Sequence, residues 1–264
     1  MAAPGLRPAM VATPWSPDSC CDHLLAGAEP VHLAPPSVHA PCTGLMDPLG
    51  IFTVFAAIPL VFLIDHRKLG ERSAPRRWSD LLEPGLRGDV VFGGWRPHAG
   101  VPFTDYNQFL LLCLLEEFGA DGIRAFAASV KGLQHNVVSA RTAGADNAPG
   151  GAVAVLPWMQ AEMAPRRAQV SVVWPDDGAY AMPIGFVARP NRLGRVRPLV
   201  ETLIGTELGG VLARNCYPPA NGAVAGAFPP GAGLKWPGWE RVREGGMTAQ
   251  AERAGRLFFD AWGG

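Results

Sequence analysis

The longest apolar run of the chain, LGIFTVFAAIPLVFLI at residues 49–64, sets the strongest limit on its fold. Pro59 interrupts the run, and Asp47 and Asp65 bound it. It is shorter than the roughly 20 apolar residues that a membrane-spanning helix needs. A continuous apolar stretch is instead typical of a strand that is buried on both faces of a sheet covered by helices. We therefore expect one kinked strand or two buried strands here.

Strand-like and helix-like segments alternate through the rest of the chain. The expected strands are residues 89–94, 151–158, 168–175 and 180–189. The expected helices are residues 78–88, 104–119, 120–133, 195–216 and 247–262, with a stop at Gly119 and a break in the fourth. This alternation predicts an α/β fold with a largely parallel sheet, in which ligands bind in loops at the carboxyl ends of the strands.

The composition bounds the kind of partner that the chain can have. Its 264 residues contain 23 Lys and Arg and 23 Asp and Glu, so the formal net charge is zero and a nucleic-acid partner is not expected. Five cysteines without CxxC spacing indicate neither a zinc site nor a disulfide framework. Residues 1–46 are rich in Pro and Ala and show no export signal. We expect this segment to be irregular and residues 47–264 to form the folded region.

Catalytic motifs are absent from the sequence. It contains no G-x-S-x-G elbow, no H-E-x-x-H pair and no G-x-x-x-x-G-K-[ST] loop. The six histidines show no spacing typical of metal ligands. We therefore expect no catalytic residue, no metal and no cofactor.

The acidic turn WPDDGAY, residues 174–180, is one candidate binding loop. Gly178 allows a tight turn or a positive φ, and Asp177 can accept hydrogen bonds from a ligand. Tyr180 offers a flat face and a hydroxyl group. The alternative is an ordinary exposed β-turn with Asp-Gly chemistry.

A second candidate loop is GGWRPHAGVPFTDY, residues 93–106, between an expected strand and an expected helix. It carries His98 and Gly100, and the start of the helix supplies free N–H groups that favour anions. Trp158 follows another expected strand and would face the same region. The alternatives are a surface connection for the loop and a buried core position for Trp158.

Several stretches together resemble the type II solute-binding proteins of ABC transporters. Residues 50–92 resemble the middle of that family, including a P-x-x-W-x-D-L-L-x-P-x-x-x-G motif formed here by Pro75, Trp78, Asp80, Leu81, Leu82, Pro84 and Gly88. Residues 172–189 are similar to the family's return crossing, and residues 198–219 to the helix pair that follows. The resemblance spans roughly residues 45–240. It is greatest to the branch that includes ferric-ion, thiamine and polyamine binders.

The resemblance implies a two-lobed type II periplasmic-binding-protein-like fold with hinge crossings. Lobe two would comprise about residues 66–172 and lobe one the flanking segments, and no opening strand–helix–strand of lobe one is recognisable in residues 1–46. Such a protein captures a small polar solute in an inter-lobe cleft, as a monomer, and delivers it to an ABC permease in the membrane. The ligand-binding residues would be His98, Gly100, Trp158, Asp177 and Tyr180.

Two alternatives stay open from the sequence: a cytoplasmic ligand-sensing or partner-binding domain of the same fold, and an α/β enzyme without a recognisable motif. The protein would be periplasmic if an upstream signal peptide was lost, and otherwise cytoplasmic. Its tyrosines, Tyr106, Tyr180 and Tyr217, include no neighbouring pair. We therefore expect no ferric site built from protein phenolates alone, and binding of iron through a synergistic anion stays open.

Overall fold

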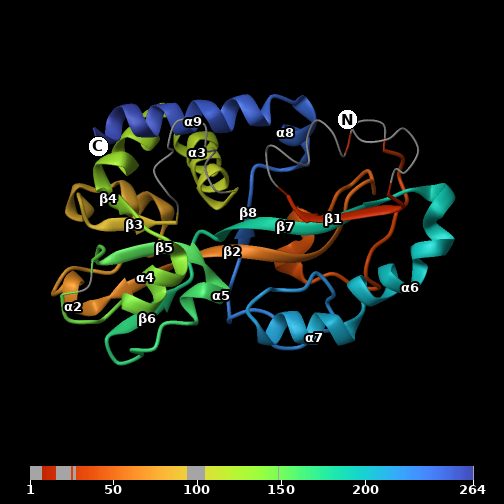
Figure 1. Cartoon of the computed structure of the whole chain (residues 1–264), viewed down its shortest axis with the longest axis horizontal. Coiled ribbons are helices and arrows are strands. Elements are labelled where there is room, and N and C mark those ends of the chain that lie inside the picture. Colours follow the sequence, from red (N-terminus) through yellow and green to blue (C-terminus); the bar gives the residue numbers. More distant parts are fainter. Residues whose placement is uncertain (1–7, 16–24, 26–27, 94–104, 148, 264) are drawn as a thin grey trace. The chain divides into compact units, whose positions relative to one another are not determined.

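The computed structural model describes residues 8–15, 25, 28–93, 105–147 and 149–263 (Figure 1). The chain divides into two compact units, and it passes from one unit to the other several times. Unit 1 comprises Met1–Ala57, Met182–Phe228 and Gly238–Gly245. Unit 2 comprises Ile58–Ala181, Pro229–Pro237 and Gly246–Gly264.

The long apolar run forms one strand, β2 (Thr53–Asp65), in which every residue is buried. This confirms the prediction of a strand without a solvent-facing side. The division between the units falls inside β2, after Ala57, and inside β7 (Ala179–Ala188), after Ala181. Both strands therefore begin in one unit and end in the other.

The sheet of unit 2 is mixed rather than largely parallel. β2 is antiparallel to β5 (Val153–Pro157) and to β6 (Val170–Val173). β3 (Val90–Phe92) lies parallel to β5 on one side and to β4 (Val130–Leu133) on the other. The expectation of a largely parallel sheet is thus wrong, because the long strand β2 runs against both of its neighbours in this unit.

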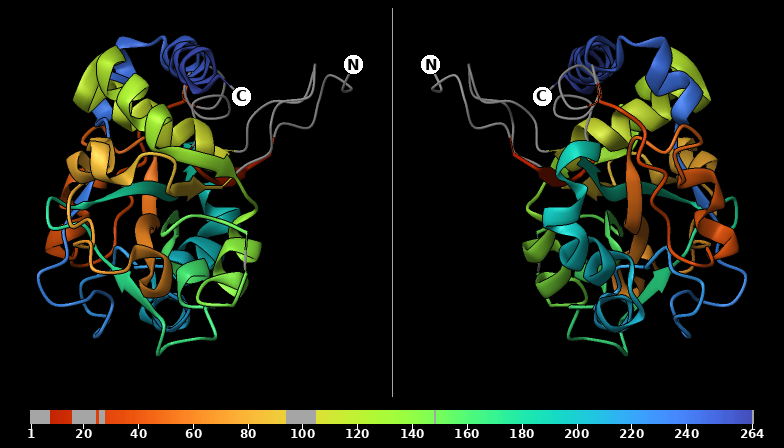
Figure 2. Two further views of the ribbon diagram at one scale, coloured as in Figure 1. Left: turned by 90° about the vertical axis from the view of Figure 1, so that its left-hand side faces the viewer. Right: turned by 90° about the vertical axis from the view of Figure 1, so that its right-hand side faces the viewer.

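Helix α3 (Asp105–Ser129) joins the two predicted helices, with a non-helical residue at Gly119, where φ is 66°. The predicted second helix ends early, because residues 130–133 pair with β3 as strand β4. The predicted terminal helix is α9 (Met247–Trp262), which packs against α3, and the two helices lie side by side in Figure 1 and in both views of Figure 2.

An aromatic cluster fills the space between α3, α9 and β3. The rings of Phe126 and Phe258 each lie with their centroids 5.4 Å from that of Phe92. The indole N–H of Trp262 donates to the carbonyl of Val130 at 2.8 Å, which fixes the end of α9 to β4.

The remaining elements of unit 2 are short. They are α2 (His66–Leu69), η2 (Trp78–Leu82), η3 (Pro84–Leu86), α4 (Asn136–Thr142), α5 (Trp158–Ala161) and β8 (Leu234–Lys235), which pairs with β7. The predicted helix at residues 78–88 is therefore a pair of 3-10 turns, since Pro84 starts the second turn.

Unit 1 is built around β7. Strand β1 (Met10–Pro14) is antiparallel to β7, and β2 is the next strand of that sheet. The predicted broken helix pair is α6 (Leu193–Ile204) and α7 (Thr206–Arg214), separated at Gly205. Phe55, Phe186 and Val200 form the core of this unit. Its other elements are η1 (Ala40–Leu45), η4 (Pro190–Arg192) and α8 (Trp239–Glu244).

Two of these elements, β1 and η1, lie within the segment that we expected to be irregular. In the part of the chain that the structure describes, no helix combines the length and the apolar character needed to cross a bilayer.

Candidate functional site

The carboxyl ends of β3, β4 and β5 share one edge of the unit 2 sheet, because these three strands are parallel. We call this the carboxyl edge; it comprises Gly93 after β3, Gln134–Asn136 after β4, and Pro157–Trp158 at the end of β5. In open α/β sheets, ligands bind at such an edge. The predicted ligand residues His98 and Gly100 follow Gly93 but lie outside the described residues.

A small cavity of about 10 Å³, with room for one water molecule, opens at the carboxyl edge. Its walls come from β2, β3, β5, α3 and α4, namely Leu60, Phe92, Gly93, Leu110, Asn136, Val155, Leu156 and Pro157. Asn136 is the one polar side chain among these described residues, and none of them is charged. The cavity is therefore apolar apart from one carboxamide group.

The carboxamide oxygen of Asn136 is buried and has no hydrogen-bond partner among the described residues. The residue is only 7% exposed, so bulk water does not replace the missing partner. Gly93 packs directly against this side chain: a Cβ atom at Gly93 would lie 2.0 Å from Asn136 Oδ1. Buried polar atoms are nearly always hydrogen-bonded in folded proteins, so this oxygen calls for an explanation.

Two further amide oxygens share this condition. Gln108 Oε1, in the first turn of α3, and Gln160 Oε1, in α5, are buried without a hydrogen-bond partner in the described part of the chain. α3 and α5 follow β3 and β5, and α4 with Asn136 follows β4. Each of the three helices that begin after these strands thus carries a buried, unpaired acceptor in its first turns. Such acceptors are suited to a ligand that donates hydrogen bonds.

Trp158 directly follows β5, as the sequence predicted, and it begins α5, a helix that was not predicted. Its indole N–H donates to Glu162 Oε1 at 3.1 Å, and its ring meets that of Trp174 edge to face, with centroids 5.3 Å apart. The side chain is half-buried and packs against the apolar cluster that includes Val61 and Leu156. Trp158 therefore combines a place at the carboxyl edge with a packing role.

The acidic turn has the backbone that the sequence predicted. Gly178 has a φ of +96°, and its N–H donates to the carbonyl of Pro175 at 3.0 Å. Trp78, from the motif at residues 75–88, donates its indole N–H to the carbonyl of Gly178 at 2.9 Å. The turn is thereby fixed to η2.

Asp177 and Tyr180 lie together in a network with Lys235. The Tyr180 hydroxyl donates to Glu117 Oε2 at 2.5 Å, and its ring lies 4.2 Å from that of Trp78. Lys235 Nζ contacts the carboxylates of Glu117 at 2.8 Å and Asp177 at 3.0 Å, and it lies over the Tyr180 ring.

This network leaves little of Tyr180 accessible. The residue is 2% exposed, and burial, with the neighbouring Glu117 carboxylate, raises the pKa of its phenol far above the usual range. Asp177 and Tyr180 thus already have partners within unit 2, and Trp158 belongs to a separate group of contacts.

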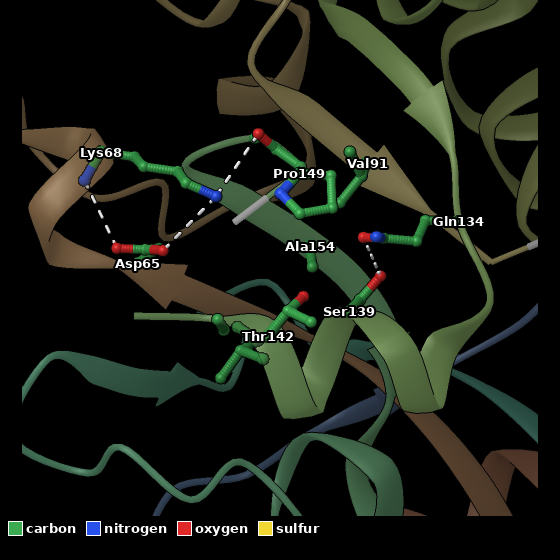
Figure 3. Close-up of a pocket in the computed structure, with 12 residues that line it drawn as sticks. Asp65, Lys68, Val91, Gln134, Ser139, Thr142, Pro149 and Ala154 are labelled. Atoms are coloured by element: carbon green, nitrogen blue, oxygen red, sulfur yellow. Dashed lines mark hydrogen bonds and ion pairs between the residues drawn. The ribbon is translucent and has the colours of Figure 1, made fainter. Parts of the chain in front are cut away.

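Figure 3 shows a second small cavity, between α4 and the sheet. Lys68 Nζ lies 3.7 Å from the Asp65 carboxylate and 3.5 Å from the carbonyl of Gly150. The hydroxyl of Ser139 donates to Gln134 Oε1 at 2.9 Å. The hydroxyl of Thr142 donates to the carbonyl of Val138 at 2.8 Å. The labelled polar side chains here thus have partners within the protein, so this cavity differs from that at the carboxyl edge.

A wide surface hollow of about 760 Å³ lies along residues 72–86 and ends at Asp176. Arg76 donates two hydrogen bonds to Asp176, at 2.8 and 2.9 Å, and these bonds lower the pKa of that carboxyl. Both side chains are exposed. Within the described residues, no group of three His, Cys, Asp or Glu side chains could hold a metal ion.

Comparison with known proteins decides the family. The family model of bacterial extracellular solute-binding proteins matches residues 26–245. The chain belongs to this family. The resemblance read from the sequence is thereby confirmed. No curated protein matches the sequence.

Solved structures of periplasmic binding proteins share the fold. A Bordetella ferric binding protein has a TM-score of 0.61 and 17% identity, over 85% of this chain and 73% of its own. A Trichodesmium protein (IdiA, FutA) in complex with iron and citrate has a TM-score of 0.62 and 15% identity, over 95% and 77%. AfuA from Actinobacillus pleuropneumoniae, with fructose-6-phosphate bound, has a TM-score of 0.59 and 15% identity, over 89% and 76%. These likenesses establish a shared α/β periplasmic-binding-protein fold.

Sequence reasoning missed Asn136 and Glu117. Residues 134–142 were assigned to no element, although a His-Asn pair before two valines is compatible with a helix start. Glu117 lies in α3 and binds both Tyr180 and Lys235, although its position in the sequence did not single it out. The sequence gives no sign of Lys235 as their partner.

Proposed function

We propose that this protein captures a small polar solute at the carboxyl edge of unit 2 and delivers it to an ABC permease, without catalysing a reaction. The unpaired amide oxygens of Asn136, Gln108 and Gln160 support this proposal most directly. An unpaired buried acceptor costs about 1–3 kcal/mol. Three such groups in helices that begin at one edge are understandable if a ligand supplies the missing partners.

The predicted ligand residues have two different roles in this proposal. Trp158, His98 and Gly100 belong to segments that follow β5 and β3, and we include them in the proposed site. Asp177 and Tyr180 would contact a solute only after their bonds to Lys235 and Glu117 had opened. We therefore propose for this second pair a supporting role, in which they hold β7 and β8 together in unit 2.

The proposal also covers the domain organisation, the location and the oligomeric state of the protein. We propose that residues 47–264 form the solute-binding region, with lobe two drawn from about residues 66–172; the segment Ile58–Ala181 of unit 2 supports this assignment. We further propose a periplasmic location, which agrees with membership of an extracellular solute-binding family, and a monomeric state.

A ligand screen tests the proposal. Because a solute that binds only the folded protein stabilises it by about 2.7 kcal/mol at 100 times its Kd, binding raises the melting temperature. We expect at least one of the following to bind: sugars, polyols, polyamines, amino acids, thiamine phosphates, inorganic phosphate or ferric citrate. The bound solute should be recovered unchanged after prolonged incubation.

A pair of matched variants locates the site. Trp158→Phe should weaken solute binding, because Trp158 lies at the carboxyl edge, whereas Trp174→Phe, at the other ring of the same aromatic pair, should leave it intact. Binding that both variants leave unchanged would place the solute elsewhere. Chemical conversion of the solute would refute the non-catalytic assignment.

A further inference from the structure

We propose that the carboxyl edge selects a neutral, hydroxyl-bearing solute, a sugar or a polyol, and that Asn136 accepts a hydrogen bond from one of its hydroxyl groups. This inference rests on the proposed function, because it names the solute class of the same site. Its starting point is the buried carboxamide oxygen of Asn136, which has no partner among the described residues.

The size of the cavity beside Asn136 fits a hydroxyl group. Its volume of about 10 Å³ admits one water-sized group, and a hydroxyl oxygen has that size. A phosphate group or a citrate-bound ferric ion is several times larger.

The charge of the cavity favours a neutral ligand. The described residues that line it carry no charged side chain, so an ammonium group or an anion would be buried there without a counter-charge. The unpaired atom of Asn136, which lines this cavity, is an amide oxygen, and such an oxygen accepts hydrogen bonds but gives none to a phosphate or carboxylate oxygen. A hydroxyl donates a hydrogen bond without bringing a charge.

Gly93 lies in close contact with the carboxamide of Asn136. A side chain at this position would collide with the carboxamide of Asn136, since its Cβ would lie 2.0 Å from Oδ1. The absence of a side chain at Gly93 therefore allows the carboxamide of Asn136 to lie against the main chain beside the cavity. Because a site built to bind a hydroxyl rejects an analogue that lacks it, Asn136 acts here as a specificity-determining residue.

The experiment measures affinities by calorimetry for D-glucose, D-fructose, D-xylose and their polyols, with putrescine, inorganic phosphate and ferric citrate as charged probes. We expect a sugar or polyol to bind and Asn136→Leu to weaken it by about tenfold, the loss of one hydrogen bond. The control is Asn215→Leu, which changes an exposed asparagine in unit 1, directly after α7, whose amide donates to the carbonyl of Val211. It should leave the affinity unchanged.

Deoxy analogues of the best sugar provide the decisive readout. One analogue, lacking the hydroxyl that faces Asn136, should bind the wild type about tenfold more weakly than the parent, yet lose nothing further on Asn136→Leu. A structural role for Asn136 would give no such coupling.

The two proposals fail in different ways. If only a charged probe binds, and Trp158→Phe weakens it, the proposed function stands and this inference is overturned. The same holds if a sugar binds with no coupling between any hydroxyl and Asn136. If no probe binds the wild type, the proposed function is overturned and this inference with it.

Discussion

Replacing Asn136 by leucine should stabilise the solute-free protein, although a polar residue in a tightly packed place usually contributes to stability. The carboxamide oxygen is buried without a hydrogen-bond partner in the described structure, a condition that costs about 1–3 kcal/mol. Leucine has a similar length and removes this polar atom. Imperfect packing of the leucine side chain against Gly93 should lower the free energy of unfolding by less than about 1.5 kcal/mol. Taken at the middle of both ranges, the net gain in the free energy of unfolding should be about 1 kcal/mol.

Urea and thermal unfolding followed by tryptophan fluorescence measure this gain. A gain of 1 kcal/mol should raise the melting temperature by about 2–4 °C for a chain of this size. The urea midpoint should rise at an unchanged slope, because the surface exposed on unfolding stays the same.

The matched control is Asn215→Leu, because Asn215 is an exposed asparagine whose amide already donates to the carbonyl of Val211 at 2.8 Å. It should lower stability or leave it unchanged. A melting temperature that falls for Asn136→Leu would show that the carboxamide makes a stabilising bond within the protein. The argument for a solute at this position would then fail.

Three further predictions concern other contacts. Gly93→Ala places a Cβ atom 2.0 Å from Asn136 Oδ1 and should destabilise by about 1–3 kcal/mol. Combining it with Asn136→Ala should recover more than half of that loss in urea unfolding, whereas strictly additive losses would contradict the collision. Tyr180→Phe removes the hydrogen bond to Glu117 and should cost about 1.5–3 kcal/mol, so an unchanged melting temperature would argue against a paired hydroxyl. Burial raises the pKa of Cys42 from 9.0 to about 12, so above pH 9 the unfolded state loses the thiol proton first and stability falls as pH rises to about 12. Cys42→Ala should flatten this decline, and an equally steep decline in the variant would refute the assignment.

The parts of the fold that were predictable from the sequence depend on local patterns. The run at residues 49–64 predicted β2 because it is apolar on both faces of a strand. Gly119 predicted the break in α3 because glycine readily adopts the positive φ found there. The short helix α4 has only seven residues, too few for a helical period to stand out. The strand β4 was read as the end of a helix for the same reason, since four residues fit either pattern.

The candidate site was harder to predict because its contacts join distant segments. Tyr180 was expected to face a ligand, because a tyrosine ring with its hydroxyl suits a binding surface as well as a core. Its surroundings come from Trp78, Glu117 and Lys235, which no sequence pattern connects. Likewise, the unpaired oxygen of Asn136 becomes visible only when Gly93 and the end of β5 are placed beside it.

The position of α9 in the chain has a consequence for how unit 2 folds during synthesis. The aromatic cluster around Phe92 and Phe126 needs Phe258, which the ribosome adds long after the strands of this unit are made. Until α9 emerges, the nascent chain holds an open apolar groove along α3. Contacts between such distant segments form slowly and leave apolar surface exposed meanwhile. Completion of unit 2 therefore waits until residues 246–264 have been made, rather than proceeding strand by strand.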